Sequence, residues 1–368
     1  MRPLAAILGF SCSCAIDGSV GELSKECVGC HERQRDELAL ARHSVAATSE
    51  VFVALRDQVA ERNGAELKEF CNGCHDRPER LGDGLACVSC HAAVGNQGIE
   101  NGRLILDLDG PVRVPSDRPM DSPHAVKASE FLLSSDLCGT CHDVSGPKAF
   151  EEHPYLHWSS SPAAERDVSC ADCHMAPITG DPDSRDTLER RQVTHAVLGL
   201  GRSTESATEL LARSIRIEAP RRVGDTVEVE LESVASGHSL PDGASFLREL
   251  WVSLEVGPSH SPRYQSGALD AGGRVVGDEL DPPKWLSARL FANDQEVESP
   301  AEADRVELRA LEPLERRTLS YRVAAGPEDR LRACVRFRRY RTELIRGLGL
   351  LDSVAGGVSE VVCSESGP

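Results

Sequence analysis

The alternation of apolar and polar residues divides the chain into two parts of different character. From about residue 205 onward, apolar residues recur at every second position in short runs separated by turn signals such as Asp270–Gly273 and Gly326–Asp329. A period of two is typical of strands with one buried face. We therefore predict that residues 205–368 form a β-sandwich of immunoglobulin-like type. The predicted strands are Ile215–Glu218, Val227–Glu232, Leu250–Val256, Leu319–Val323 and Ala333–Arg338.

The first part has helical rather than strand patterning. Residues Gln34–Arg62 are rich in Glu, Leu, Ala and Arg and contain no Pro or Gly, which predicts one long helix. Prolines at 111, 115, 119 and 123 exclude a long helix in that stretch. The expected fold is a two-domain α + β protein, with a mostly helical and irregular domain at 21–204. Shorter helices are predicted at Ala65–Phe70, Ala125–Ser134, Thr187–Arg191 and Glu205–Arg213.

Five copies of a Cys-x-x-Cys-His pentapeptide lie in the first domain. With 14 Cys and 12 His in 368 residues, shuffling gives only about 0.02 copies. Zinc sites use pairs of Cys-x-x-Cys without a fixed His after each. The pattern predicts five covalently bound haem c groups, each with the motif His as proximal iron ligand. The motifs are Cys27, Cys30, His31; Cys71, Cys74, His75; Cys87, Cys90, His91; Cys138, Cys141, His142; and Cys170, Cys173, His174.

The amino-acid composition is consistent with a core that consists largely of cofactor. Aromatic residues are only 4% of the chain, so a protein core of ordinary side chains would be difficult to fill. We expect the porphyrins to take that place. The net charge of −18 argues against nucleic acid and against anionic membrane surfaces as partners. The same charge can steer a basic redox partner or simply keep the protein soluble.

The N-terminus and the remaining cysteines indicate export. Thioether attachment takes place outside the cytoplasm, and Arg2 followed by the apolar run Leu4–Phe10 resembles a signal peptide over residues 1–20. Cleavage would leave a soluble protein; lipidation of Cys12 or Cys14 would give a lipid anchor. We expect a periplasmic or outer-surface location. Cys334 and Cys363 are predicted to form a disulfide, the alternative being two separate buried thiols.

The second axial ligand decides between an electron carrier and a catalyst. Seven His lie outside the motifs, whereas Met120 and Met175 are the only Met after the start residue. His/Met ligation is therefore not expected to dominate. We predict His43, His124, His195 and His238 as distal ligands. His157 is the fifth candidate, with His153 four residues earlier as its substitute, and His260 is expected to be an exposed turn residue.

The sequence resembles exported multihaem cytochromes c of the cytochrome c554-like group. The similarity covers Glu26–Gly243, and the Trp158 phrase departs from the family pattern because His153 and His157 have no settled role there. The resemblance implies that the isolated His are distal ligands and that a β-sandwich follows. It is carried by Ala41–Ala46, Ser122–His124, Leu137–Asp143, Trp158–Ser161, Val168–Pro177, Thr194–Gly199 and Gly237–Gly243.

These observations favour electron transfer through mainly bis-His haems. The expected partners are redox proteins, such as other cytochromes or a membrane-bound respiratory complex. One alternative is an oxidoreductase acting on a small nitrogen or sulfur oxyanion. Pentahaem nitrite reductases have as many haems, but their catalytic motif ends in Lys, whereas all five motifs here end in His. Another alternative is a subunit of an extracellular haem polymer.

Overall fold

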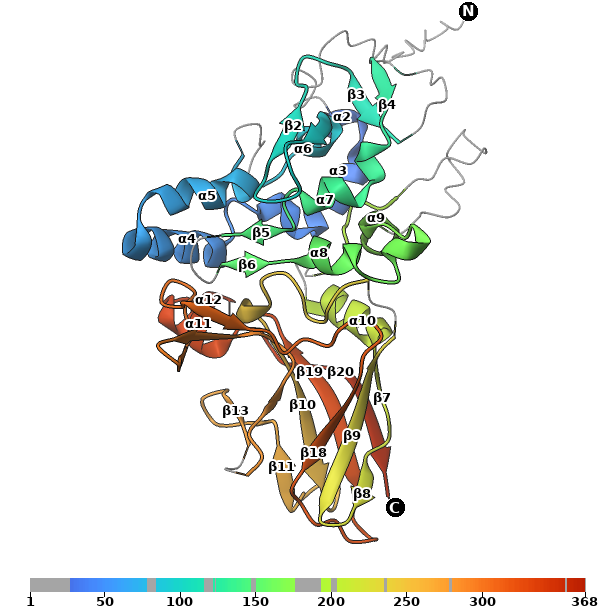
Figure 1. Cartoon of the computed structure of the whole chain (residues 1–368), viewed down its shortest axis with the longest axis vertical. Coiled ribbons are helices and arrows are strands. Elements are labelled where there is room, and N and C mark those ends of the chain that lie inside the picture. The colour runs from blue at the N-terminus through green and yellow to red at the C-terminus, as the bar shows by residue number, and fades with distance from the viewer. Residues whose placement is uncertain are drawn as a thin grey trace, which may run out of the picture.

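The computed structural model places a helical region on one end of a β-sheet region (Figure 1). The helical region holds the five motifs, and the sheets hold the second half of the chain. No helix within the described residues is both long enough and apolar enough to cross a membrane. The structure describes residues 27–77, 84–115, 122, 124–146, 150–175, 193–199, 204–234, 237–277, 280–354 and 356–367.

Short helices and helical turns dominate the first half. Each of the five motifs lies on one of them, wholly or in part. The helices are α2 (Cys27–Cys30), α3 (Glu32–Leu40), α4 (Glu50–Asn63), α5 (Glu66–His75), α6 (Cys87–His91), α7 (Ser135–Gly139), α8 (Pro154–Ser159) and α9 (Cys170–His174). The 3-10 turns are η1 (Arg42–Val45), η2 (Phe131–Leu133) and η3 (Ala164–Arg166).

Three small two-stranded ribbons join these helices. One is antiparallel between β1 (Ala93–Asn96) and β2 (Leu104–Leu106). The second is parallel, between β3 (Val112–Val114) and β4 (Val126–Ala128). The third is antiparallel, between β5 (Val144–Ser145) and β6 (Glu151–Glu152). Such short ribbons fix the connections between motifs without adding a large core.

The predicted single helix over Gln34–Arg62 is wrong, because the chain breaks between α3 and α4. Ala41 has an extended backbone (ψ 152°) and is fully buried. The η1 turn follows, and the carbonyl of His43 accepts a hydrogen bond from the Leu85 amide at 2.8 Å. Helix propensity is a weak preference that such tertiary contacts override. The break leaves His43 on a turn.

The predicted helix at Ala125–Ser134 is also wrong. Its first residues pair with β3 instead: the Val112 amide donates to the Ala125 carbonyl at 3.0 Å, and the Ser129 amide to the Val114 carbonyl at 2.8 Å. Regular helix begins only at Ser135. The helix predicted at Ala65–Phe70 exists, but it continues to His75. The predicted Thr187–Arg191 helix lies outside the described residues.

The two largest sheets of the second half are antiparallel. The first has the order β11-β10-β19-β20, with β14 also on β10, and the second has the order β18-β9-β7, with β8 on β9. The strands are β7 (Ile215–Ile217), β8 (Arg221–Val223), β9 (Thr226–Ser233), β10 (Glu249–Val256), β11 (Tyr264–Ser266), β14 (Lys284–Trp285), β18 (Arg316–Tyr321), β19 (Leu331–Arg338) and β20 (Ser359–Ser366).

One apolar core lies between these sheets. Along β9, alternate residues are buried, as the period of two predicts: Val227, Val229 and Leu231 are fully buried. They cluster with Leu250 and Val252 of the other sheet. The five predicted strands coincide or overlap with β7, β9, β10, β18 and β19. The mixed α and β fold is confirmed, whereas the immunoglobulin-like type stays a prediction.

Smaller elements surround the two sheets. The helix predicted at Glu205–Arg213 is present as α10 (Thr204–Ser214). The turns at 270–273 and 326–329 close with backbone hydrogen bonds of 3.0 and 3.1 Å. The other elements are η4 (Ser245–Leu247), β12 (Ala268–Leu269), β13 (Val275–Val276), β15 (Arg289–Ala292), β16 (Gln295–Val297), β17 (Arg305–Glu307), α11 (Thr342–Gly347) and α12 (Leu351–Val354).

Helix α4 joins the two halves. Its residues Leu55 and Val59 are buried in one cluster with Ala301 and Leu344. The Asn63 side-chain amide also donates to the carbonyl of Ala301 at 3.1 Å. Burying such apolar side chains stabilises a contact by roughly 1.5–3 kcal/mol each. The two halves therefore share part of their core, and the predicted domain boundary at 204/205 stays a prediction.

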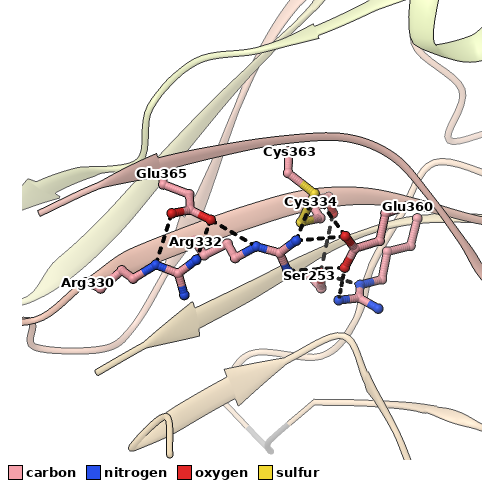
Figure 2. The surroundings of a disulfide bond; sticks show 8 residues. Ser253, Arg330, Arg332, Cys334, Glu360, Cys363 and Glu365 are labelled. Atoms are coloured by element: carbon pink, nitrogen blue, oxygen red, sulfur yellow. Dashed lines mark hydrogen bonds and ion pairs between the residues drawn. A yellow bond between two sulfur atoms is a disulfide. The ribbon is translucent and has the colours of Figure 1, made fainter. Parts of the chain in front are cut away.

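The predicted disulfide between Cys334 and Cys363 is confirmed. The two cysteines face each other across β19 and β20 (Figure 2). Charged side chains flank the bond on the same face. Arg332 pairs with Glu360 at 2.7 Å and donates to the Cys363 sulfur at 3.4 Å. The disulfide therefore links the last strand covalently to the central strand β19.

Removing this disulfide should lower stability. The double variant Cys334→Ala, Cys363→Ala opens a loop with a sequence separation of 29. On the chain-entropy estimate the loss is about 3–4 kcal/mol in the free energy of unfolding. Urea denaturation followed by far-UV circular dichroism measures it. Reduced wild type should match the variant, and an unchanged midpoint would contradict the stabilising role.

Candidate haem-binding sites

The helical turns give each motif the geometry that thioether attachment requires. On a helix, residues three and four apart lie on the same face, so both cysteines and the following histidine project together. Motif Cys170–His174 begins with a capping box in which Ser169 accepts from the Asp172 amide at 3.3 Å. None of the ten motif cysteines forms a disulfide, so each could form a thioether with a haem vinyl group.

Four proximal histidines each face a histidine from outside the motifs. The ring centroids are 6.3 Å apart for His31 and His124, and 5.9 Å for His142 and His43. They are 6.3 Å apart for His91 and His195, and 6.1 Å for His174 and His238. A metal bound about 2.0 Å from one nitrogen of each imidazole separates the two centroids by roughly 6 Å. The four spacings fit an iron between each pair.

The four partner histidines come from irregular segments. His43 lies on η1, and His124 precedes β4. His195 lies in the segment 193–199, where its backbone amide donates to Glu37 at 2.8 Å. His238 comes from a loop after β9, so the sheet region contributes directly to a haem-binding pair. Loops can adjust a ring position without disturbing a regular element.

Hydrogen bonds at Nδ1 orient several of these rings. The Nδ1 atoms of His91 and His174 lie 2.8 and 2.7 Å from the carbonyls of Arg113 and Leu198. His238 makes the same contact with the Ser239 carbonyl at 2.9 Å. A carbonyl accepts from Nδ1–H, which leaves Nε2 as the nitrogen with a free lone pair. These rings present Nε2 for metal binding.

Burial favours the neutral imidazole at these positions. It lowers the pKa of both His75 and His142 to about 4, and for His142 the neighbouring His43 adds to the effect. Burial is also the main cause that lowers the pKa of His43. A metal binds the deprotonated nitrogen, so a neutral ring is ready to act as ligand.

His75 is the exception among the proximal histidines. Its ring neighbour in the described part of the chain is Phe52, stacked at 4.1 Å with an angle of 9° between the ring planes. The Nδ1 atom of His75 lies 3.2 Å from the Ala46 carbonyl. Face-to-face stacking puts Phe52 beside the imidazole, not along its Nε2 direction. Phe52 therefore packs on the proximal side of this site.

His157 and His153 contact carboxylates instead of a proximal histidine. His157 Nδ1 lies 2.7 Å from Asp242 Oδ2, and His153 Nδ1 lies 3.0 Å from Asp143 Oδ1. Neither is among the ring pairs above, so the geometry gives no support to His157 or its substitute as fifth distal ligand. His260 is exposed in a turn, as expected.

Two acidic residues that the sequence reading missed connect these histidines to the sites. The side chain of Asp242 is only 7% exposed and also lies 3.6 Å from His238 Nδ1, so it links His157 to a ring pair. Asp143 directly follows His142 and also accepts from the Leu156 amide at 2.8 Å. Both lie in the phrases that carry the family resemblance, which is the one signal that could have identified them.

Thiols of different motifs lie side by side. Cys27 is within hydrogen-bonding reach of Cys87, Cys74 of Cys141, and Cys138 of Cys170. Burial and the neighbouring Cys141 raise the pKa of Cys90 to about 11. The spacing of only 16 residues between Cys71 and Cys87 predicts that these two motifs are close neighbours, but the thiol contacts join each of them to other motifs. The motif with Cys138 and Cys141 contacts the most neighbours.

An apolar hollow adjoins the motif of α5. It is a small hollow, partly open to solvent. Apolar side chains and a motif thiol together suit the edge of a porphyrin, which is itself largely apolar. Free thiols, neutral imidazoles at the required spacing and this lining all fit haem c. The lining residues are Val59, Asn63, Leu67, Phe70, Cys71, Phe150 and Pro300.

Comparison with solved structures identifies the fold. The chain superposes on the crystal structure of a penta-heme cytochrome c552 from Thermochromatium tepidum with a TM-score of 0.70. The chain has a multihaem cytochrome c fold. The match covers 95% of this chain and 99% of that chain, at 18% sequence identity. No family model matches the sequence, and no curated protein matches it. Membership of the cytochrome c554-like group stays a prediction.

Asp242→Asn should destabilise the protein more in acid than in base. The hydrogen bond to Asp242 raises the pKa of His157. A raised folded-state pKa gives stability that is complete below the unfolded pKa and is lost as pH rises through the folded value. Urea denaturation at about pH 5.5 and at about pH 8.5 should therefore show that the variant loses more unfolding free energy at the lower pH.

Exposed His260 supplies the matched control, since His260→Gln should change stability at neither pH. Equal losses for Asp242→Asn at the two pH values would contradict the ionic role of the His157–Asp242 pair.

Proposed function

We propose that this chain is an exported electron-transfer protein that carries five covalently bound haem c groups. The observation that supports it best is the set of four facing histidine pairs, with centroid separations of 5.9–6.3 Å. Each pair combines a motif histidine with one distant in sequence. Chance packing of 12 histidines would not favour this combination at one common spacing.

Each site is named here by its proximal histidine. The motif thiols would form the two thioethers, and His31, His75, His91, His142 and His174 would bind on the proximal side. His124, His195, His43 and His238 would be the distal ligands of the His31, His91, His142 and His174 sites, respectively. When bound, haem c supplies a one-electron Fe(III)/Fe(II) couple.

The protein side chains adjust these sites toward electron transfer. At four of the sites a motif histidine and its facing histidine would together hold the haem iron, so little ligand exchange would be needed when the oxidation state changes. Ring orientation is fixed by Nδ1 bonds to backbone carbonyls, such as that of His174 to Leu198. Bis-His ligation also gives lower potentials than His/Met ligation. The chain is thus suited to carry low-potential electrons.

The neighbouring thiols support a branched arrangement of the sites. The His31 site adjoins the His91 site through Cys27 and Cys87, and the His75 site adjoins the His142 site through Cys74 and Cys141. The His142 site also adjoins the His174 site through Cys138 and Cys170. The charge of Cys141 acts on Cys90, which connects the His31 and His91 sites with the other three sites. The His142 site would be the branch point.

Three further points extend the proposal. Export follows from thioether attachment, which takes place outside the cytoplasm, and a lipid anchor at Cys12 or Cys14 is the alternative to a cleaved soluble form. The partner would be another redox protein, attracted in part by the net charge of −18. The β region would be an immunoglobulin-like sandwich that completes the haem region of a cytochrome c554-like protein.

A second candidate function comes from the His75 site. Its ring neighbour among the described residues is Phe52, whereas the other four proximal rings face histidines. An iron with one protein ligand has a free position for a small molecule. This observation favours an oxidoreductase acting on a small nitrogen or sulfur oxyanion at the His75 site, fed by the other four.

Removing one proposed distal histidine should change the spin state of the iron at one site. His43→Gly deletes the ring that faces His142 at 5.9 Å, so the His142 site should gain a high-spin signal in low-temperature EPR. A pyridine haemochrome assay should still give five haems per chain, because all the motif residues remain. His260→Gly, an exposed turn variant, should leave the spectrum unchanged. An unaltered spectrum for His43→Gly would refute this ligand assignment.

Carbon monoxide should bind the reduced protein at about one equivalent per chain, because within the described residues only the His75 site lacks a facing histidine. Optical titration measures the stoichiometry. His43→Gly should raise it to about two, since a second position becomes free. Wild type that binds no carbon monoxide would exclude the second candidate function and leave the electron carrier.

A further inference from the structure

Two arginines meet at the junction of the helical and sheet regions. Arg42, on η1, donates to the Tyr340 hydroxyl at 2.8 Å and to the Ser49 hydroxyl at 2.9 Å. Arg248, just before β10, donates to the Arg339 carbonyl at 3.0 Å. Its guanidinium carbon lies 5.1 Å from the centroid of the Tyr340 ring. Buried Tyr340 therefore holds both arginines in one place.

Neither arginine is in contact with a carboxylate of the described residues, although the charge of Glu152 acts on Arg248 from a greater distance. Among the described residues, no carboxylate forms an ion pair with Arg42 or with Arg248, although the chain is acidic overall. Elsewhere in the sheet region, buried arginines are paired, as Arg338 is with Glu249. A guanidinium keeps its charge at neutral pH. Arg42 and Arg248 are both half-buried, and partly removing a cation from water without an ion-pair partner costs free energy, which an anion bound here would offset.

The arginine pair lies beside two of the haem-binding sites. Arg42 directly precedes His43, which faces His142. The Ala46 carbonyl, at the end of the same turn, contacts His75 Nδ1 at 3.2 Å. Glu152 relates Arg248 to the His75 site, because its charge acts on Arg248 and also on Cys71 and Cys74 of that motif. An anion held here would therefore belong to the His75 or the His142 site.

We propose that Arg42 and Arg248, held by Tyr340, bind a haem propionate from the His75 or the His142 site. The inference rests on the proposed function, because a propionate is present only when haem is attached. Guanidinium groups bind carboxylates through paired hydrogen bonds, which suits this chemistry. Because Arg42 comes from the helical region and Arg248 from the sheet region, the propionate would join the two regions.

Potentiometric titration of Arg248→Gln tests the proposal. Reduction adds an electron near the propionate, so removing a positive charge should shift one of the five midpoint potentials in the negative direction. Arg248→Lys keeps the charge and should restore most of the shift. Following high-spin and low-spin signals separately assigns the shift to the His75 or the His142 site. Arg316→Gln, an exposed and paired arginine on β18, should leave all potentials unchanged.

Two outcomes would overturn the inference. The first is an Arg248→Gln protein with five haems whose potentials all equal those of wild type. The second is a wild-type potential that shifts when phosphate replaces chloride at constant ionic strength, since a free anion would then occupy the arginines. Loss of haem from wild type itself, measured by the haemochrome assay, would instead refute the proposed function. The readouts thus separate the two failures.

Discussion

Axial ligation is the constraint on which the rest of this structure depends. Two imidazoles must stand about 6 Å apart and face each other, and in four cases the second comes from far along the chain. A regular helical bundle could not satisfy this requirement at every site. This requirement explains the break at Ala41, the short β ribbons and the loop of His238. Regular structure persists where a motif needs a helical turn.

The sheet region contributes directly to the proposed haem sites. Its loop supplies His238, its residues Leu344 and Ala301 pack on α4, and Arg248 faces the junction. Asp242 in the same loop contacts both His157 and His238. The core between the sheets holds this loop against the helical region. Stability of the sheets and ligation at the His174 site are therefore physically linked.

The sequence was a better guide to the chemistry of the motifs than to the conformation of the backbone. Cys-x-x-Cys-His is a local signal, and strands such as β9 follow from strict alternation. The histidines that face the motif rings could be named only as candidates. Spacing along the chain does not show which two rings lie opposite each other in the folded protein. His157 illustrates the limit: the sequence offered it as a candidate ligand, but its contact with the carboxylate of Asp242 was not visible there. The helices over 34–62 and 125–134 failed because distant backbone groups, Leu85 and Val112, compete for their hydrogen bonds.

The His238 loop bears on the order of assembly. Attachment of a porphyrin to Cys170 and Cys173 needs only a pentapeptide, whereas closure of the pair with His174 needs the loop that follows β9. Covalent bond formation is thus local, and ligation waits for contacts distant in sequence, which form slowly. During maturation the proposed His174 site would pass through a stage with a single protein ligand. A protein that carried its haem at this motif would, at that stage, still be an immature electron carrier.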